Sequence, residues 1–366
     1  MTTLSATTVA RARQHSLLLA TESARSVLDV ATWFGAMQAQ DAASGVWSLG
    51  VRVAGSTKAD VDAAFERAEV IRTWPMRGTI HIVPARDARW MLALTGPRAL
   101  SGTQTRRQQL DLTSNDLERA VDVLGIALAG GRLTRAATLA ALQDAGLDTS
   151  SQRGYHLLWY ASQVGVTCIG PMEGKEQTFV LLDQWAPDQV TMDSGDALVE
   201  LALRYFRSHG PATIKDFAGW TGLTLTAARA AVAGNDGRLV SAPFEDGELW
   251  MTSELLSAID DGATAQPLPA VALPGFDEFL LGFKDRRVQL APENMEQVVP
   301  GSNGMFRSTI CIDGRAVATW VRTARKSRID VTLEPFAPLG SRQVTSAERA
   351  LDRYADFLGL PVVCAW

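Results

Sequence analysis

One pattern occurs three times along the chain and limits the folds that it can adopt. An apolar or β-branched run is followed by a proline, a glycine three or four residues later, and a second apolar run. Proline ends a strand and glycine supplies a turn, so each copy predicts a β-hairpin. The copies lie at 70–83, 166–182 and 239–251. This repetition indicates tandem copies of one small structural unit.

Helical patterns precede each hairpin. Before the third one, apolar residues recur at helical spacing over 197–206. Thr213 is placed to cap a short helix at 214–220, and a glycine turn leads into a third helix that ends near residue 233. Three helices followed by a two-stranded hairpin describe a winged helix.

We therefore expect an α+β protein with three tandem winged-helix modules followed by a β-rich C-terminal domain. The Asp-Gly pair at 313–314 predicts a hairpin in this last domain. A second strand pair over 329–333, a helix over 346–358 and a terminal strand over 361–365 complete it. The predicted boundaries are 1–110, 111–190 and 191–262 for the modules and 263–366 for the β-rich domain.

The composition excludes several classes of protein. Hydrophobic residues make up 46% of the 366 residues and charged residues 20%, which is typical of a globular chain. No apolar run reaches the roughly 18–20 residues that cross a bilayer, and the N-terminus lacks the features of a secretory signal. The three cysteines form no CxxC pair and the four histidines have no metal-ligand spacing. We expect a cytoplasmic protein with free thiols, no metal and no other cofactor.

Charge is distributed unevenly. Residues 1–110 contain 13 basic and 8 acidic residues, whereas the whole chain has a net charge of −5. A basic N-terminal part in an acidic protein indicates a polyanionic partner.

The motifs of common hydrolases and transferases are missing, including GxSxG, the GKS/GKT phosphate loop, GxGxxG and HExxH. The candidate for chemistry is the stretch MQAQD at 37–41, expected near the end of a helix that starts at Val27, with Met37 in its apolar stripe. In an extended backbone Gln38 and Gln40 point the same way, whereas in a helix they lie about 200° apart. A pair of amides can orient one water but is no strong base, so it suits a reaction with a good leaving group.

The alternative for Gln38 and Gln40 is a role as surface amides at a helix end. Asp41 is the nearby carboxylate, and its alternative role is to cap a helix.

Four stretches carry a family resemblance: MQAQD, RTWPMRGTIHIVPARD downstream of it, and LPGFDEFLLGFKDRR and DGRAVATWVR near the C-terminus. With these the chain resembles the AlkZ/YcaQ family of winged-helix DNA glycosylases over essentially its whole length. In that family a Gln–apolar–Gln or Gln–apolar–Asp motif is catalytic. Here the motif is Gln38-Ala39-Gln40, which resembles the AlkZ branch.

The resemblance implies monofunctional hydrolysis of the N-glycosidic bond of N7-alkylated purines in double-stranded DNA, including bulky and crosslinked adducts. Housekeeping repair and self-resistance to a DNA-alkylating natural product both fit. Alkylation at N7 makes the base a cationic leaving group, so the enzyme mainly positions water and stabilises an oxocarbenium-like transition state. With five lysines in the chain and none near the motif, no Schiff base and no strand cleavage are expected.

Further residues are expected to contact DNA. Arg77 is suited to pairing with a phosphate, and Trp74 or His81 to bordering the lesion; the alternatives are a packed Trp74 and a hydrogen-bonded His81. Basic residues near the C-terminus are expected to contact the phosphates of DNA and to make the affinity for DNA depend on salt; the alternative is a solvated basic edge. These are Lys284, Arg286, Arg287, Arg322, Arg325, Lys326 and Arg328.

Winged helices are more often regulators than enzymes, so the fold does not establish catalysis. The alternatives are a non-catalytic DNA-binding transcriptional regulator and a protein that sequesters a genotoxin. A regulator usually presents one recognition helix per protomer and dimerises. Three fused modules fit better with a monomer that wraps a duplex, and this favours the glycosylase.

Overall fold

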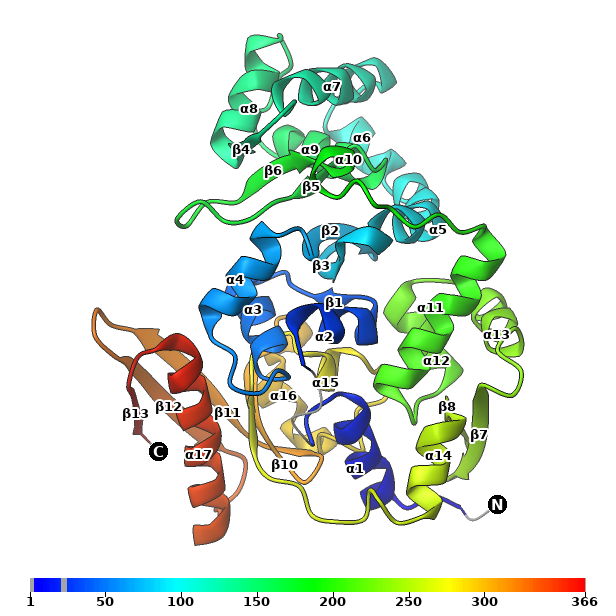
Figure 1. Ribbon diagram of the computed structural model, residues 1–366, viewed down its shortest axis with the longest axis vertical. Coiled ribbons are helices and arrows are strands. Elements are labelled where there is room, and N and C mark those ends of the chain that lie inside the picture. Colours follow the sequence, from blue (N-terminus) through cyan, green and yellow to red (C-terminus); the bar gives the residue numbers. More distant parts are fainter. Residues whose placement is uncertain (1–2, 21–24, 366) are drawn as a thin grey trace. The chain divides into compact units, whose positions relative to one another are not determined.

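The computed structural model describes residues 3–20 and 25–365 (Figure 1). The chain divides into two compact units. Unit 1 combines the residues up to Val61 with those from Val199 onward, and unit 2 is Asp62–Leu198. Both units mix helices and strands, which confirms the α+β class. The winged-helix modules, the β-rich domain and their boundaries remain predictions.

Unit 2 is built around two of the predicted hairpins. Strand β2 (Val70–Met76) pairs with β3 (Thr79–Pro84), and β5 (Thr167–Ile169) pairs with β6 (Thr178–Leu181), all antiparallel. β2 also pairs with β5, and β4 (Arg132–Thr134) with β6, so the strand order in this unit is β3-β2-β5-β6-β4. The helices of unit 2 are α5 (Ala88–Ser101), α6 (Gln104–Gln109), α7 (Ser114–Ala127), α8 (Arg135–Asp144), α9 (Arg153–Gln163) and α10 (Leu182–Trp185).

The third predicted hairpin is in unit 1, where β7 (Leu239–Phe244) pairs with β8 (Gly247–Thr252). It follows α11 (Ser194–His209), α12 (Ile214–Thr221) and α13 (Leu225–Ala233). The Thr213 side chain caps α12 as predicted, by accepting from the Asp216 amide. Further helices of this unit are α1 (Ala6–Ser16), α2 (Val27–Phe34), α3 (Ala42–Gly50), α14 (Ser253–Asp260), α15 (Glu278–Leu281) and α16 (Met295–Val298). Helix α4 (Lys58–Glu66) begins in unit 1 and ends in unit 2.

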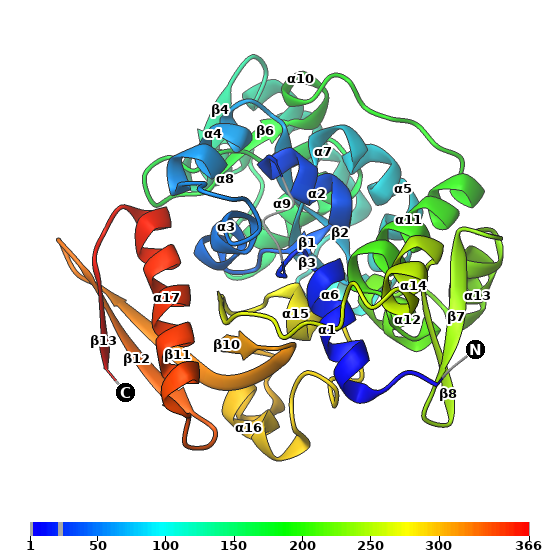
Figure 2. The ribbon, with the colours of Figure 1, turned by 60° about the horizontal axis from the view of Figure 1, so that its bottom comes forward.

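The C-terminal part of unit 1 contains a sheet of order β13-β12-β11-β10-β9. The predicted Asp-Gly hairpin forms from β10 and β11, and the terminal strand is β13, parallel to β12. The strand pair predicted over 329–333 is wrong, because these residues form the single strand β12. The predicted C-terminal helix, α17, lies along this sheet (Figure 2). The elements are β9 (Val271–Leu273), β10 (Ser308–Ile312), β11 (Arg315–Ala324), β12 (Ile329–Pro335), α17 (Ser341–Leu358) and β13 (Val362–Ala365).

Aromatic side chains join α3 to this sheet and helix. The ring of Trp47 lies 5.0 Å from that of Tyr354 and 4.8 Å from that of Phe357, both on α17. Tyr354 also packs on Trp320 of β11, at 5.3 Å. The Trp47 indole N–H donates to the Ala272 carbonyl at 2.8 Å. Helix α3, which directly follows the MQAQD motif, is therefore fixed in the core of unit 1.

Within residues 3–20 and 25–365, no helix combines the length and the apolar character that a bilayer crossing requires. Nor do three His, Cys, Asp or Glu side chains of these residues gather into a group suited to a metal ion. All three cysteines are free thiols.

Candidate active site

The MQAQD motif lies outside the helix in which it was expected. Helix α2 ends at Phe34, because Gly35 takes a left-handed φ of 78° that turns the chain out of the helix. Strand β1 (Met37–Gln38) follows, so Met37 does not belong to the helical stripe and that prediction is wrong. Of the two backbone alternatives, the structure shows the extended one at Gln38.

The two glutamines differ in exposure. The Gln38 residue is 8% exposed, which contradicts the interpretation of this residue as a surface amide at a helix end. Gln40 is exposed. The motif therefore presents one amide from the interior of unit 1 and one from its surface.

Asp41 caps a helix, which was the alternative to a role in the chemistry. Its side chain accepts a hydrogen bond from the Ser44 amide at 2.7 Å and so caps α3. Because α3 is packed into the aromatic core, this cap fixes the C-terminal end of the motif.

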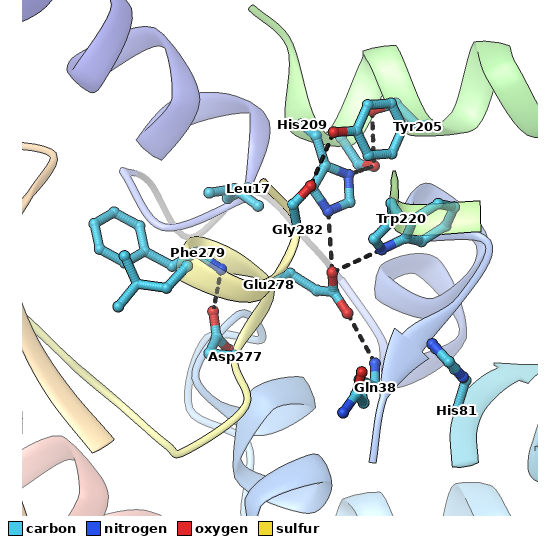
Figure 3. Close-up of polar contacts among 12 residues, drawn as sticks. Leu17, Gln38, His81, Tyr205, His209, Trp220, Asp277, Glu278, Phe279 and Gly282 are labelled. Atoms are coloured by element: carbon cyan, nitrogen blue, oxygen red, sulfur yellow. Dashed lines mark hydrogen bonds and ion pairs between the residues drawn. The ribbon is translucent and has the colours of Figure 1, made fainter. Parts of the chain in front are cut away.

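The buried carboxylate of Glu278 contacts the motif directly. Glu278 is 1% exposed and starts α15. Its Oε1 accepts a hydrogen bond from the backbone N–H of Gln38 at 2.8 Å. Its Oε2 accepts from Trp220 Nε1 at 3.0 Å and lies 3.2 Å from His209 Nε2 (Figure 3).

The neighbouring acid, Asp277, belongs to a different network. It forms a bidentate pair with Arg52, with both N–O distances 2.8 Å, and side-chain exposures of 3% and 0% respectively. Ser48 donates to the same carboxylate. Two adjacent buried acids thus have separate partners, a guanidinium for Asp277 and N–H groups with an imidazole for Glu278.

Three residues of the predicted DNA-contact set lie in the β2–β3 hairpin of unit 2. Trp74 is 2% exposed, and its ring meets that of Tyr155 edge-on at 6.4 Å. His81 is fully buried, and its Nδ1 lies 2.9 Å from the Thr79 carbonyl oxygen. Arg77 is exposed at the turn, where its Nη2 lies 3.4 Å from His81 Nε2. Arg77 is thus accessible, whereas Trp74 and His81 are packed; a role of any of the three toward DNA remains a prediction.

The predicted arginines of the C-terminal part lie in unit 1 and have protein partners, whereas the predicted lysines, Lys284 and Lys326, are exposed. Arg286 Nε donates to the Leu280 carbonyl at 2.6 Å, and its guanidinium lies over the Phe306 ring. Arg287 pairs with Asp285 at 2.7 Å. Arg322 donates to the Tyr354 hydroxyl and lies over the same ring.

Arg325 and Arg328, at the end of the β11–β12 hairpin, both pair with Asp330, at 2.9 and 2.6 Å. Hydrogen bonds from Arg328 and Arg325 hold the pKa of the Asp330 carboxyl below its ordinary value. These arginines are more than half exposed and their pairing is therefore weak.

Comparisons with known proteins settle the family. A sequence profile described as DNA glycosylase AlkZ-like matches residues 31–357, which include the motif, Glu278 and most of both units. The chain belongs to the AlkZ-like DNA glycosylase family. It is a DNA N-glycosylase, and this decides between the enzyme and the regulator.

A curated relative of the glycosylase comes from Streptomyces sahachiroi and is named interstrand DNA cross-link repair glycosylase. It is 29% identical over 294 residues, which cover 75% of this chain and 78% of the relative. The solved structure of the Streptomyces sahachiroi DNA glycosylase AlkZ matches the fold with a TM-score of 0.82. That match covers 100% of both chains at 24% identity.

Glu278 is a residue of the candidate site that the sequence did not reveal, together with its partners Trp220 and His209. It lies 240 positions after Gln38, and no local pattern connects the two. A signal was present in LPGFDEFLLGF, where two acids interrupt an apolar run, because an acid in such a setting is usually buried with specific partners. The signal did not indicate which partners these are.

Proposed function

We propose that this glycosylase hydrolyses the N-glycosidic bond of N7-alkylated purines in double-stranded DNA, with Gln38 and Gln40 as the catalytic pair. The observation that carries the proposal is the placement of the Gln-x-Gln motif. It is extended at Gln38, follows a left-handed turn, ends on a helix cap, and has a buried carboxylate at its backbone. Bulky and crosslinked adducts are included, as self-resistance to a DNA-alkylating natural product would require; the Streptomyces relative is named for cross-link repair.

The chemistry follows from the substrate and from the groups present. Alkylation at N7 gives the purine a positive charge, so it leaves as a neutral base when the bond to C1′ breaks. The electron pair of that bond goes to the base, and an oxocarbenium-like centre forms at C1′. The side-chain carbonyls of Gln38 and Gln40 accept hydrogen bonds from one water and aim its oxygen at C1′. Water adds to C1′ and loses a proton to solvent, which leaves an abasic site.

We propose that the enzyme acts as a monomer and contacts the duplex through basic residues. Arg77 is exposed at a hairpin turn and Arg287 is exposed in unit 1. Arg286 and Arg322 are partly exposed, and each lies over an aromatic ring that limits its motion. Trp74 and His81 stabilise this hairpin from within, and border the lesion if the base is drawn toward it. The winged-helix modules are proposed to carry these contacts along the duplex.

The test is base release from two DNA substrates, one containing N7-methylguanine and one treated with a nitrogen mustard to form interstrand crosslinks. Wild type is compared with the Gln38→Ala/Gln40→Ala variant under single-turnover conditions. The control is Gln104→Ala/Gln108→Ala, in which two exposed glutamines of α6 are removed.

We expect wild type and the control to release the base and leave abasic sites without nicks. The motif variant should bind DNA but release base about 10³-fold more slowly, within the range of positioned catalytic groups. Equal release by the motif variant would show that the pair is not catalytic. No release from either substrate by wild type would show that N7-alkylpurines are the wrong substrate class.

A further inference from the structure

We propose that Glu278 is a positioning residue that fixes the peptide of Gln38. The catalytic consequence of this role rests on the proposed function, but the contact itself does not. Both carboxylate oxygens face N–H groups: Oε1 accepts from the Gln38 amide at 2.8 Å and Oε2 from the Trp220 indole at 3.0 Å. An ionised carboxylate only accepts hydrogen bonds, so these donors match it.

The carboxylate is held by an aromatic cage from α11 and α12. His209, whose Nε2 lies 3.2 Å from Oε2, stacks on Tyr205 with a centroid distance of 4.5 Å and an interplanar angle of 10°. Trp220 packs 5.4 Å from the same imidazole. The Tyr205 hydroxyl donates to the Gly282 carbonyl at 2.9 Å, which ties the cage to the end of α15 (Figure 3). Glu278 therefore has little freedom to move away from Gln38.

The backbone that carries Glu278 is equally fixed. Asp277 accepts from the Phe279 backbone amide at 2.9 Å as the cap of α15, and Arg52, two residues after the end of α3, pairs with Asp277. At the other end of α15, a Cβ on Gly282 would lie 2.3 Å from an atom of the His209 ring. Helix α15 and the cage are thus in direct contact, with no room for a side chain between them.

The segment that carries Gln38 has little regular secondary structure of its own to fix its position. Strand β1 has only two residues, and the chain turns at Gly35 on one side and enters α3 after Asp41 on the other. A displacement of about 1 Å in a group that aligns a reactant can lower a rate about 10²-fold. Glu278 contacts the backbone in the middle of this segment, at Gln38, whose side-chain amide is proposed to orient water.

Two substitutions separate position from charge. Glu278→Asp keeps the charge but is one methylene too short to reach both Gln38 and the cage. Glu278→Gln loses the charge but keeps an acceptor at the same distance for the Gln38 amide, while losing the contact with Trp220. Ser48→Ala is the matched control, because it removes two side-chain hydrogen bonds, with Asp277 and with Arg52, from the neighbouring network and leaves Glu278 intact.

The direct measurement is amide hydrogen exchange at Gln38, followed by nuclear magnetic resonance. We expect Glu278→Asp to speed this exchange about tenfold or more, and Glu278→Gln and Ser48→Ala to change it less than about threefold. The single-turnover rate constant for base release should fall about 10²-fold in Glu278→Asp. In Glu278→Gln it should stay within about tenfold of wild type, a rescue that a group needed for its charge would not show.

Unchanged exchange at Gln38 in a folded Glu278→Asp variant would overturn the proposal. So would a loss of base release in Glu278→Gln that equals or exceeds the loss in Glu278→Asp while Gln38 stays protected, since the charge would then be the active feature. If Glu278→Asp does not fold, Glu278→Met takes its place, because it removes the acceptor of the Gln38 amide without leaving a buried charge. We expect faster exchange at Gln38 than in Ser48→Ala, and equal exchange would overturn the proposal.

The exchange measurement also separates this inference from the proposed function. If wild type released no alkylated base, the substrate assignment would fail. Faster Gln38 exchange in Glu278→Asp would still show that Glu278 fixes the motif.

Discussion

The motif segment at 37–41 and the end of the β11–β12 hairpin at 322–330 both carry residues proposed for function, yet they are built in opposite ways. Beside the motif, the acids Asp277 and Glu278 are buried and their partners come from distant parts of the chain, such as Arg52 for Asp277. At the hairpin end, Arg325 and Arg328 are more than half exposed and pair with Asp330, two to five residues away.

This difference teaches what each region is suited to do. Removing one partner of a buried charge destabilises the protein strongly, so such a pair is suited to fixing the positions of the residues around it. Exposed charges pair weakly and exchange partners readily, so they can transfer from a carboxylate to a phosphate. We expect changes near the motif to alter folding stability and reaction rate, and changes in the hairpin to alter affinity and its dependence on salt.

The largest effect is expected from Arg52→Met, which leaves Asp277 buried without its cation. The free energy of unfolding should fall by about 3–5 kcal/mol, measured by urea denaturation. The control is Arg325→Met, an arginine of an exposed pair, for which a loss below about 1 kcal/mol is expected. Similar losses in the two variants would remove the distinction between the regions.

The next largest effects are expected from single substitutions of the two motif glutamines. Gln38→Ala and Gln40→Ala should each lower the single-turnover rate of base release by about 10²–10³-fold, as for other preorganised polar groups. Because Gln38 is buried and Gln40 is exposed, only Gln38→Ala should also lower the melting temperature. A rate unchanged by either substitution would remove that glutamine from the proposed mechanism.

The hairpin arginines should mainly affect binding. The Arg325→Ala/Arg328→Ala variant should bind duplex DNA more weakly, and the slope of log affinity against log salt should decrease by about two. Fluorescence anisotropy over a range of salt concentrations measures this slope. A weaker affinity with an unchanged slope would contradict phosphate contacts by these residues.

The smallest effect concerns Asp330, which is expected to compete with DNA for Arg325 and Arg328. Asp330→Asn should raise DNA affinity by about threefold, with a steeper salt slope. Acid should act in the same direction. The pKa of Asp330 is lowered by Arg328 and Arg325, so the two ion pairs are fully formed at pH values above the ordinary carboxyl range. They are lost as the pH falls through the lowered pKa, and this frees the arginines for phosphate. A decrease in the affinity of Asp330→Asn would show that the carboxylate orders the hairpin for binding.

Local sequence signals predicted the hairpins, which depend on residues close together in the chain. The three hairpins and the Asp-Gly hairpin formed at the predicted positions, because turn glycines and apolar strands act within a few residues. The prediction that proline ends the first strand is wrong for two of them, since Pro75 lies within β2 and Pro243 within β7. The helix before the motif was extended too far, since Met37 continued an apolar spacing that Gly35 had already ended. The single strand β12 was interpreted as a pair, because its partners lie outside it on both sides.

The site was predicted only in part for a related reason. The Gln-x-Gln motif is contiguous and could be recognised, and the cap formed by Asp41 is a contact over three residues. The support from Glu278, Trp220 and His209 depends on contacts across 58 to 240 positions. Helix and strand periodicity contain no information on such pairings, so these residues could be expected to be buried but not to meet.

Asp41 has a consequence for how this part of the chain can vary. It directly follows the Gln38-Ala39-Gln40 motif and is the cap of α3, so no spacer separates the motif from the helix. An inserted or deleted residue here would shift either the capping side chain away from the Ser44 amide or the glutamines away from their places. Loops elsewhere in the chain can lengthen without such a conflict. Relatives that share this architecture should therefore keep the number of residues from Gly35 to Ser44 constant, even where their sequences differ, with Ser, Thr or Asn as the acceptable replacements for Asp41.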